Sequence, residues 1–292
     1  MKNKRILTIT ICIFSLFKLY ASDNMVKVPA TEFYRKLDNG ITQKVYLDSF
    51  YVSRTMITVD EWIFYLNNSK RYSTKEIEYW KRKIKTEADS FYEYNLSINP
   101  QWPAYFISFE EVVEYCNWKS EKDGYTKYYI IKYEDGIKKI SNDIYSNGYR
   151  ILTKAEWQYL SGITNLDNNL SKDELLKHGG FLENSLDSLP SSICTYKPTK
   201  FGLYDLFGTI NEYLWDFYNI DDNATEIKNP QGAKTFIPDE DQVYYKEPLN
   251  ENRYYVSGSF RESVEDCIND PFYHCISTVK SIIGFRLVRN AE

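Results

Sequence analysis

The pattern of apolar and polar positions along the chain predicts three helices that begin in the same way. The segments are "TVDEWIFYL" from Thr58, "SFEEVVEYCNW" from Ser108 and "TKAEWQYL" from Thr153, and in each a Glu stands three positions after the hydroxyl residue. In such a capping box the hydroxyl accepts a hydrogen bond from a first-turn backbone N–H, and the Glu accepts one from the N–H of the cap residue. The apolar residues that follow recur at helical spacing, so each helix is expected to bury one face.

A charged stretch separates the first two of these helices. Residues 70–100 read "KRYSTKEIEYWKRKIKTEADSFYEYNLSINP", with Ile77, Tyr79, Trp80 and Ile84 interspersed among charges of both signs. We interpret this stretch as a partly helical, solvated insertion.

Strand patterns lie between the second and third predicted helices and near the C-terminus. The segment "YTKYYIIKYEDGIKKISNDIYSNGYRIL" alternates β-forming residues around Asp135-Gly136, which predicts a hairpin, and Asn147-Gly148 then turns the chain towards the third helix. Near the C-terminus, "RYYVSGSF" and "IIGFRLV" predict two short strands with a long irregular segment between them.

The first 22 residues have the character of a secretory signal peptide. Basic residues (Lys2, Lys4 and Arg5) precede an apolar run from Ile6 to Phe17, and small residues follow at positions 21 and 22. The run is shorter than the roughly 20 residues of a membrane span, although a retained anchor is the alternative. We therefore expect an exported protein, periplasmic, secreted or on the cell surface, with no stable membrane span after cleavage.

Charge and composition narrow the class of protein. Without the first 22 residues, which hold four positive charges and no negative ones, the formal net charge moves from -5 to -9. This balance excludes nucleic acid as a partner, because phosphate contacts need clustered Lys and Arg. Aromatic residues make up 17% of the chain, including 27 Tyr. We expect a core of amphipathic rings whose hydroxyls reach water or partners.

Cysteine and histidine usage excludes some kinds of site. Four cysteines follow the signal segment (Cys116, Cys194, Cys267 and Cys275), and they allow three disulfide connectivities that the spacing does not distinguish. The chain has only two histidines, so a zinc site built on imidazoles is excluded. Cys116 falls on an apolar helical face, which favours a buried thiol or half of a disulfide over a nucleophile.

The order of the motifs resembles the formylglycine-generating enzyme, or sulfatase-modifying factor, family. The matching segments are "FYVSRTMITVDEWIFYL", "YFISFEEVVEYCNWKSEKDG", "NGYRILTKAEWQYLSG", "KFGLYDLFGTINEY", "VSGSF" and "GFRLV". The resemblance implies an α+β, C-type-lectin-like domain with little regular sheet, several short helices and long loops. It places a lead-in at residues 23–44 and the domain at residues 45–292, with residues 70–100 as an insertion.

The resemblance also locates a catalytic site, from which this chain departs. Enzymes of the family oxidise a cysteine of sulfatases to formylglycine, using copper held by two thiolates that follow the glycine-serine-aromatic motif. The matching positions here are Glu262 and Cys267. A carboxylate cannot replace a thiolate as a soft ligand, so copper is not expected, unless Cys275 moves in from a different loop. Cys267 is the catalytic candidate that remains, and we favour a structural role for it. Further departures stand at Thr209, Asn211 and Ser257.

Two functions of different classes remain open. The first is a non-catalytic binding or scaffold module for an unknown protein or glycan ligand. The alternative is a formylglycine-generating oxidase acting on a cysteine of sulfatases or other proteins by divergent chemistry. A related sulfoxide-forming iron enzyme is disfavoured, because it needs a histidine triad. Four aromatic residues in the loop region of the family's active site can form a binding surface or pack internally: Tyr254, Tyr255, Phe272 and Tyr273.

A structural calcium ion is the expected cofactor. In the resembled family, a calcium ion takes oxygens from the positions that match the Asp205 side chain, the carbonyls of Gly208 and Ile210, and the Glu212 carboxylate. Calcium prefers such sets of carboxylate and carbonyl oxygens, and Gly208 allows the sharp turn. The alternative is a strand and turn whose carboxylates face solvent or cap backbone N–H groups. A second calcium site is expected to begin at Asn184.

Overall fold

The structure, a computed structural model, describes the greater part of the chain. The described ranges are 24–37, 39–88, 97–134, 137–164, 171–186, 189–217, 224–232, 252–256, 258–269, 271–276 and 280–291. The predicted signal peptide, the turn pair Asp135-Gly136 and Ser257 lie outside them.

Six helices occur in the described ranges: α2 (Val59–Asn68), α3 (Thr74–Ala88), α4 (Phe109–Asp123), α5 (Lys154–Ser161), α6 (Lys172–His178) and α7 (Val264–Asn269). The three predicted capping boxes are confirmed at the starts of α2, α4 and α5, where Thr58, Ser108 and Thr153 each exchange hydrogen bonds with the Glu three positions on. None of the helices within these ranges is long and apolar enough to cross a membrane.

The strands form four small sheets. The first sheet has the order β1 (Met25–Val28), β4 (Phe50–Ser53), β13 (Val288–Asn290), β7 (Tyr149–Arg150). The second has the order β11 (Phe272–Ile276), β10 (Asn252–Val256), β8 (Asn211–Phe217), β12 (Ile283–Gly284). The third is β2 (Thr31–Lys36), β3 (Thr42–Leu47), β9 (Glu226–Lys228), and the predicted hairpin is confirmed as β5 (Tyr129–Glu134) and β6 (Ile137–Asn142). The pairings are antiparallel except for β12 with β8 and β3 with β9.

The C-terminal region contains more regular structure than the sequence pattern predicts. "RYYVSGSF" contains β10 as expected, but "IIGFRLV" supplies β12 and the start of β13, which belong to two different sheets. The intervening segment is not irregular: it carries α7 and β11, and β11 pairs with β10 in antiparallel register. Strand β11 is stabilised by this partner strand, which local sequence does not reveal.

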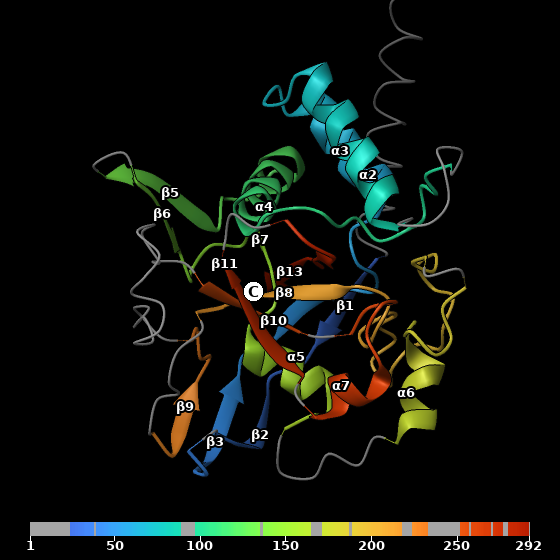
Figure 1. Cartoon of the computed structure of the whole chain (residues 1–292). Helices are drawn as coiled ribbons and strands as arrows, with labels where there is room; N and C mark the ends of the chain where they lie inside the picture. The colour runs from blue at the N-terminus through green and yellow to red at the C-terminus, as the bar shows by residue number, and fades with distance from the viewer. Residues whose placement is uncertain are drawn as a thin grey trace, which may run out of the picture.

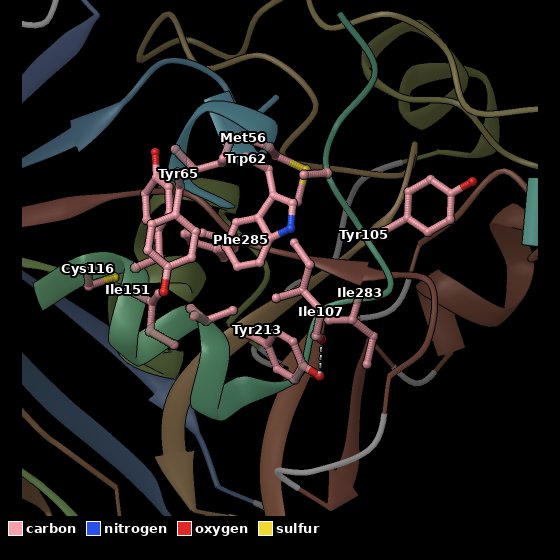
Figure 2. Packing of buried hydrophobic residues seen from close by; sticks show 14 of the residues in the cluster. Met56, Trp62, Tyr65, Tyr105, Ile107, Cys116, Ile151, Tyr213, Ile283 and Phe285 are labelled. Atoms are coloured by element: carbon pink, nitrogen blue, oxygen red, sulfur yellow. Dashed lines mark hydrogen bonds between the residues drawn. The ribbon is translucent and has the colours of Figure 1, made fainter. Parts of the chain in front are cut away.

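The core is aromatic, as the composition predicts. Figure 2 shows Trp62 packed among Met56, Tyr65 and Phe285, and the Tyr213 hydroxyl donating to the carbonyl oxygen of Ile107 at 3.1 Å. The Tyr213 and Tyr105 hydroxyls thus reach backbone carbonyl oxygens while their rings fill the interior.

Helix α3 confirms that residues 70–100 are partly helical, but it corrects the expectation that the stretch is solvated. Ile77, Trp80 and Ile84 are buried, and the Trp80 indole Nε1 donates to the carbonyl oxygen of Tyr105 at 3.2 Å. Figure 1 shows α3 beside α2 at one end of the molecule, opposite the β2–β3–β9 sheet. One face of α3 thus belongs to the core, and only its other face is solvated.

Candidate functional site: two carboxylate clusters beside strand β8

The loop that precedes β8 is tightly turned. Asp205, Gly208 and Thr209 have φ angles of 52°, 70° and 68°, in the left-handed region that L-residues seldom adopt. A Cβ atom on Gly208 would lie 2.7 Å from the carbonyl oxygen of Gly180, so the position requires glycine for space as well as for backbone angle. These turns bring Asp205 and Glu212 inside the protein, where both are buried.

Glu212 faces an arginine that sequence analysis missed. The Arg286 Nε lies 2.7 Å from Glu212 Oε1, with side chains 0% and 4% exposed respectively. The same guanidinium donates to the carbonyl oxygens of Tyr204, at 3.2 Å, and Asp205, at 3.0 Å. Burial raises the pKa of Glu212, although Arg286 opposes that shift. Arg286 lies in the "GFRLV" motif, but the sequence does not show that its charge pairs with Glu212.

The Asp205 carboxylate is held by the loop itself. Its Oδ2 accepts from the backbone N–H of Cys194 at 3.1 Å, and its Oδ1 accepts from the Thr209 hydroxyl at 3.2 Å. Burial raises the pKa of Asp205. The carbonyl oxygen of Gly208 accepts from the N–H of Ile210 at 2.9 Å. The alternative in which the carboxylates of Asp205 and Glu212 face solvent is wrong, because both residues are buried.

The predicted calcium ligands form an oxygen-only set that fits a hard cation. Glu212 Oε2 is buried and has no hydrogen-bond partner among the described residues, which is the state of an oxygen available to a cation. Arg286 already neutralises this carboxylate, however, and its charge opposes a second cation. The described residues also contain no group of three or more His, Cys, Asp or Glu side chains suited to a metal. Calcium at Asp205, Gly208, Ile210 and Glu212 stays a prediction.

Asn184, the predicted start of a second calcium site, forms hydrogen bonds with three backbone groups around the turn after α6. Its Oδ1 accepts from the N–H of Phe181 at 2.7 Å, and its Nδ2 donates to the carbonyl oxygens of Leu176 and Gly179, both at 3.1 Å. The side chain therefore has a structural role in this turn, and a calcium ion there stays a prediction.

The second cluster surrounds Gly258, at the end of β10. The N–H of Gly258 donates to Asn211 Oδ1 at 2.8 Å and to Glu262 Oε2 at 3.1 Å. Glu262 Oε1 accepts from the Asn211 Nδ2 at 3.4 Å. Asn211 and Glu262, two positions where the chain departs from the family pattern, are thus bound to each other. Their side chains hold the loop that carries Glu262.

Cys267 approaches the same glycine from α7. Its Sγ lies 3.4 Å from the position of a Cβ on Gly258, and the residue is 7% exposed. Cys267 lines a small pocket together with Trp157, Phe181 and Phe207. The structure therefore brings the two positions that the resemblance assigns to copper together at Gly258, one polar and hydrogen-bonded, the other in apolar surroundings.

Two other cysteines lie apart from this cluster and form no disulfide. Cys116 is buried in α4, as its helical face predicts, and burial raises its pKa. Cys194 is exposed on the loop beside Asp205. The side chain of Cys275 lies outside the described residues, so its predicted alternative role is not addressed.

The four aromatic residues proposed as a binding surface divide between core and surface. Tyr254 is buried, and its ring lies 4.3 Å from the Nζ of Lys154 and close to Phe272. Tyr255 stacks on Tyr273 with ring centroids 5.9 Å apart, and Tyr273 is exposed. Neighbouring residues of a strand face opposite sides of the sheet. The sequence does not show which side is buried, so it does not tell Tyr254 from Tyr255.

Comparisons with known proteins agree on the fold. Chaperone protein LppX of Paenibacillus barcinonensis is 22% identical over 229 residues, covering 68% of this chain and 73% of that protein. Treponema denticola variable protein 1 superposes with a TM-score of 0.67 at 18% identity, covering 91% of this chain and 95% of that one. For PvdO from Pseudomonas aeruginosa the TM-score is 0.60 at 18% identity, covering 91% and 94%. For CarF it is 0.55 at 19% identity, covering 92% and 98%.

These structural neighbours have C-type-lectin-like folds of the formylglycine-generating-enzyme type, which establishes the fold class. At such low identity the likeness shows the fold alone. The sequence profile of the sulfatase-modifying factor enzyme 1-like domain matches residues 16–291. Because that profile spans nearly the whole chain, this protein belongs to the sulfatase-modifying factor enzyme 1-like family.

Proposed function

We propose that this family member is an exported, non-catalytic binding module. The observation that carries the proposal is Glu262, which stands where the family's chemistry needs the first copper thiolate. Both oxygens of its carboxylate accept hydrogen bonds, from the Gly258 N–H and the Asn211 amide. A carboxylate oxygen is a hard donor, whereas Cu(I) prefers thiolates, so this position supports the loop and offers little affinity for copper.

The surroundings of Cys267 support the same proposal. A thiol reacts as the thiolate, which apolar surroundings disfavour, and reactive cysteines sit in electropositive, partly exposed places. Cys267 is instead 7% exposed and lines a small pocket with Trp157, Phe181 and Phe207.

Two further observations favour a binding role. A relative of 22% identity bears the name of a chaperone, and an activity of that kind depends on binding another protein. The first 22 residues have the pattern of a signal peptide, which supports export. Calcium belongs to the proposal as a structural ion, since it would stabilise the folded loop beside β8 by binding only the folded state.

The test is incubation of the purified protein with copper, oxygen and a peptide that carries a sulfatase-type cysteine motif. We expect no aldehyde by mass spectrometry, and formation of the aldehyde by the wild-type protein would refute the proposal. Glu262→Cys is the matched variant, because it restores a thiol beside Cys267. We expect this variant to bind Cu(I) more tightly than wild type, and the gain to disappear in Glu262→Cys/Cys267→Ser.

A further inference from the structure

A cavity between α2, α3 and the start of α4 lies apart from both carboxylate clusters. Its volume is about 100 Å³. Because one water needs about 10–15 Å³ of such space, the cavity holds roughly seven to ten waters, or a single small ring compound. It is lined by Trp62, Leu66, Tyr72, Glu76, Tyr79, Trp80, Phe106, Glu111 and Lys280.

Aromatic rings make up most of the wall. The Trp62 and Trp80 rings have centroids 6.4 Å apart and planes inclined at 50°. Phe106 has a φ of 60°, so the backbone is held in the left-handed region to place this ring. For a bulky residue that conformation is a genuine outlier, and such strain clusters at functional sites. Tyr79 also lines the cavity and is 48% exposed.

The wall also carries an unsatisfied buried donor. Trp62 is 1% exposed, and its indole Nε1 has no hydrogen-bond partner among the described residues. Figure 2 shows this nitrogen turned away from Tyr65, on the side where Tyr105 lies. Trp80 binds the Tyr105 carbonyl, so α3 approaches from that side. This nitrogen exposes almost no surface, so a ligand in the cavity cannot reach it, and Trp62 contributes its ring alone to the wall.

Charged groups of both signs complete the lining. Lys280 Nζ lies 2.7 Å from Glu111 Oε1, and their side chains are partly exposed. Glu76 Oε2 accepts from both the N–H and the hydroxyl of Ser73. The cavity thus offers a hydrogen-bond donor at Lys280 and acceptors at the two carboxylates, set around apolar ring faces.

We propose that this cavity binds a single neutral sugar residue, such as the terminal hexose of a glycan. A sugar ring has an apolar C–H face for the aromatic wall, and hydroxyls that accept from Lys280 and donate to Glu76 and Glu111. An anion is disfavoured by the two carboxylates. An organic cation would compete with Lys280, which already occupies the carboxylate of Glu111.

This inference rests on the proposed binding function and gives its ligand a chemical class and a place. The proposed binding function and the sugar site can be refuted independently. Aldehyde formation on the sulfatase-type peptide would refute the binding module whatever this cavity does. Absence of sugar binding here would leave the assignment of Glu262 and Cys267 unchanged.

The test is saturation-transfer-difference NMR on the full mature protein with the methyl glycosides of glucose, galactose, mannose and N-acetylglucosamine, each at millimolar concentration. We expect transfer to ring protons of at least one glycoside. Trp62→Phe keeps one aromatic ring but removes the rest of the indole from the cavity wall, so binding should weaken about three- to tenfold. Tyr79→Ala removes an exposed wall and should weaken binding without altering the melting temperature.

Tyr133→Ala is the matched control, because Tyr133 is 68% exposed on the β5–β6 hairpin, outside the cavity. Its binding should equal that of the wild type. The inference is overturned by the absence of transfer to all four glycosides, or by transfer that Tyr79→Ala and folded Trp62→Phe leave unchanged. Displacement of the sugar by tetramethylammonium at equal concentration would likewise overturn it in favour of a cation site.

Discussion

Replacement of Arg286 by methionine tests the role of the buried ion pair beside β8. Methionine replaces the aliphatic part of the arginine with an apolar side chain of similar length and removes the guanidinium. Glu212 Oε1 then loses its partner at 2.7 Å, and the carbonyl oxygens of Tyr204 and Asp205 lose donors at 3.2 Å and 3.0 Å. Because Glu212 is only 4% exposed, water does not replace these contacts.

Arg286→Met is expected to lower the free energy of unfolding, because it leaves the buried Glu212 carboxylate without a partner. Removal of one partner from a buried ion pair destabilises a protein by about 3–5 kcal/mol, a large part of a typical total of about 5–15 kcal/mol. At roughly 2–4 °C per kcal/mol, the melting temperature of Arg286→Met should fall by about 6–20 °C. In Glu212→Gln/Arg286→Met no charge is left unpaired, so the double variant should be more stable than the sum of the two single changes predicts.

Urea unfolding followed by circular dichroism measures these free energies. The loss in Arg286→Met should also shrink as the pH falls. The folded-state pKa of Glu212 is already raised by burial and rises further without Arg286, and protonation of such a group favours the folded state as the pH falls towards the unfolded-state value. A single variant within about 1 kcal/mol of wild type, or strictly additive single changes, would contradict the reasoning.

Three other predictions concern the same half of the molecule. Calcium chelation should lower the melting temperature of the wild type, and Asp205→Ala should abolish this effect. Because the charge of Arg286 opposes the ion, we expect a weak dissociation constant of about 10⁻⁴–10⁻³ M. An unchanged melting curve of the wild type with chelator would refute the site. Burial raises the pKa of Asp216 to about 6, so its contribution to stability grows by up to ~3 kcal/mol as the pH falls from 7 to 4. That gain should be missing from the urea unfolding of Asp216→Asn. Gly179→Ala should destabilise the protein by about 1–3 kcal/mol in the same assay, because its Cβ would lie 1.6 Å from the carbonyl oxygen of Phe207; wild-type stability would contradict this contact.

Local sequence determined the helix starts and the family. The capping boxes at Thr58, Ser108 and Thr153 involve residues three positions apart, and a contact so short in sequence forms within the helix whatever surrounds it. The β5–β6 hairpin is local in the same sense. The ordered motifs identified the fold class, and the count from Phe260 singled out Glu262 and Cys267.

Only the tertiary structure decided what the carboxylates and aromatic rings face. Glu212 and Arg286 are 74 positions apart, and their pairing depends on β12 lying parallel to β8. Trp80 appeared solvated among its charged neighbours, yet α3 buries it against Tyr105. The physical reason is the same in both cases: burial and charge pairing are set by distant segments that meet only in the folded chain, whereas the sequence displays near neighbours.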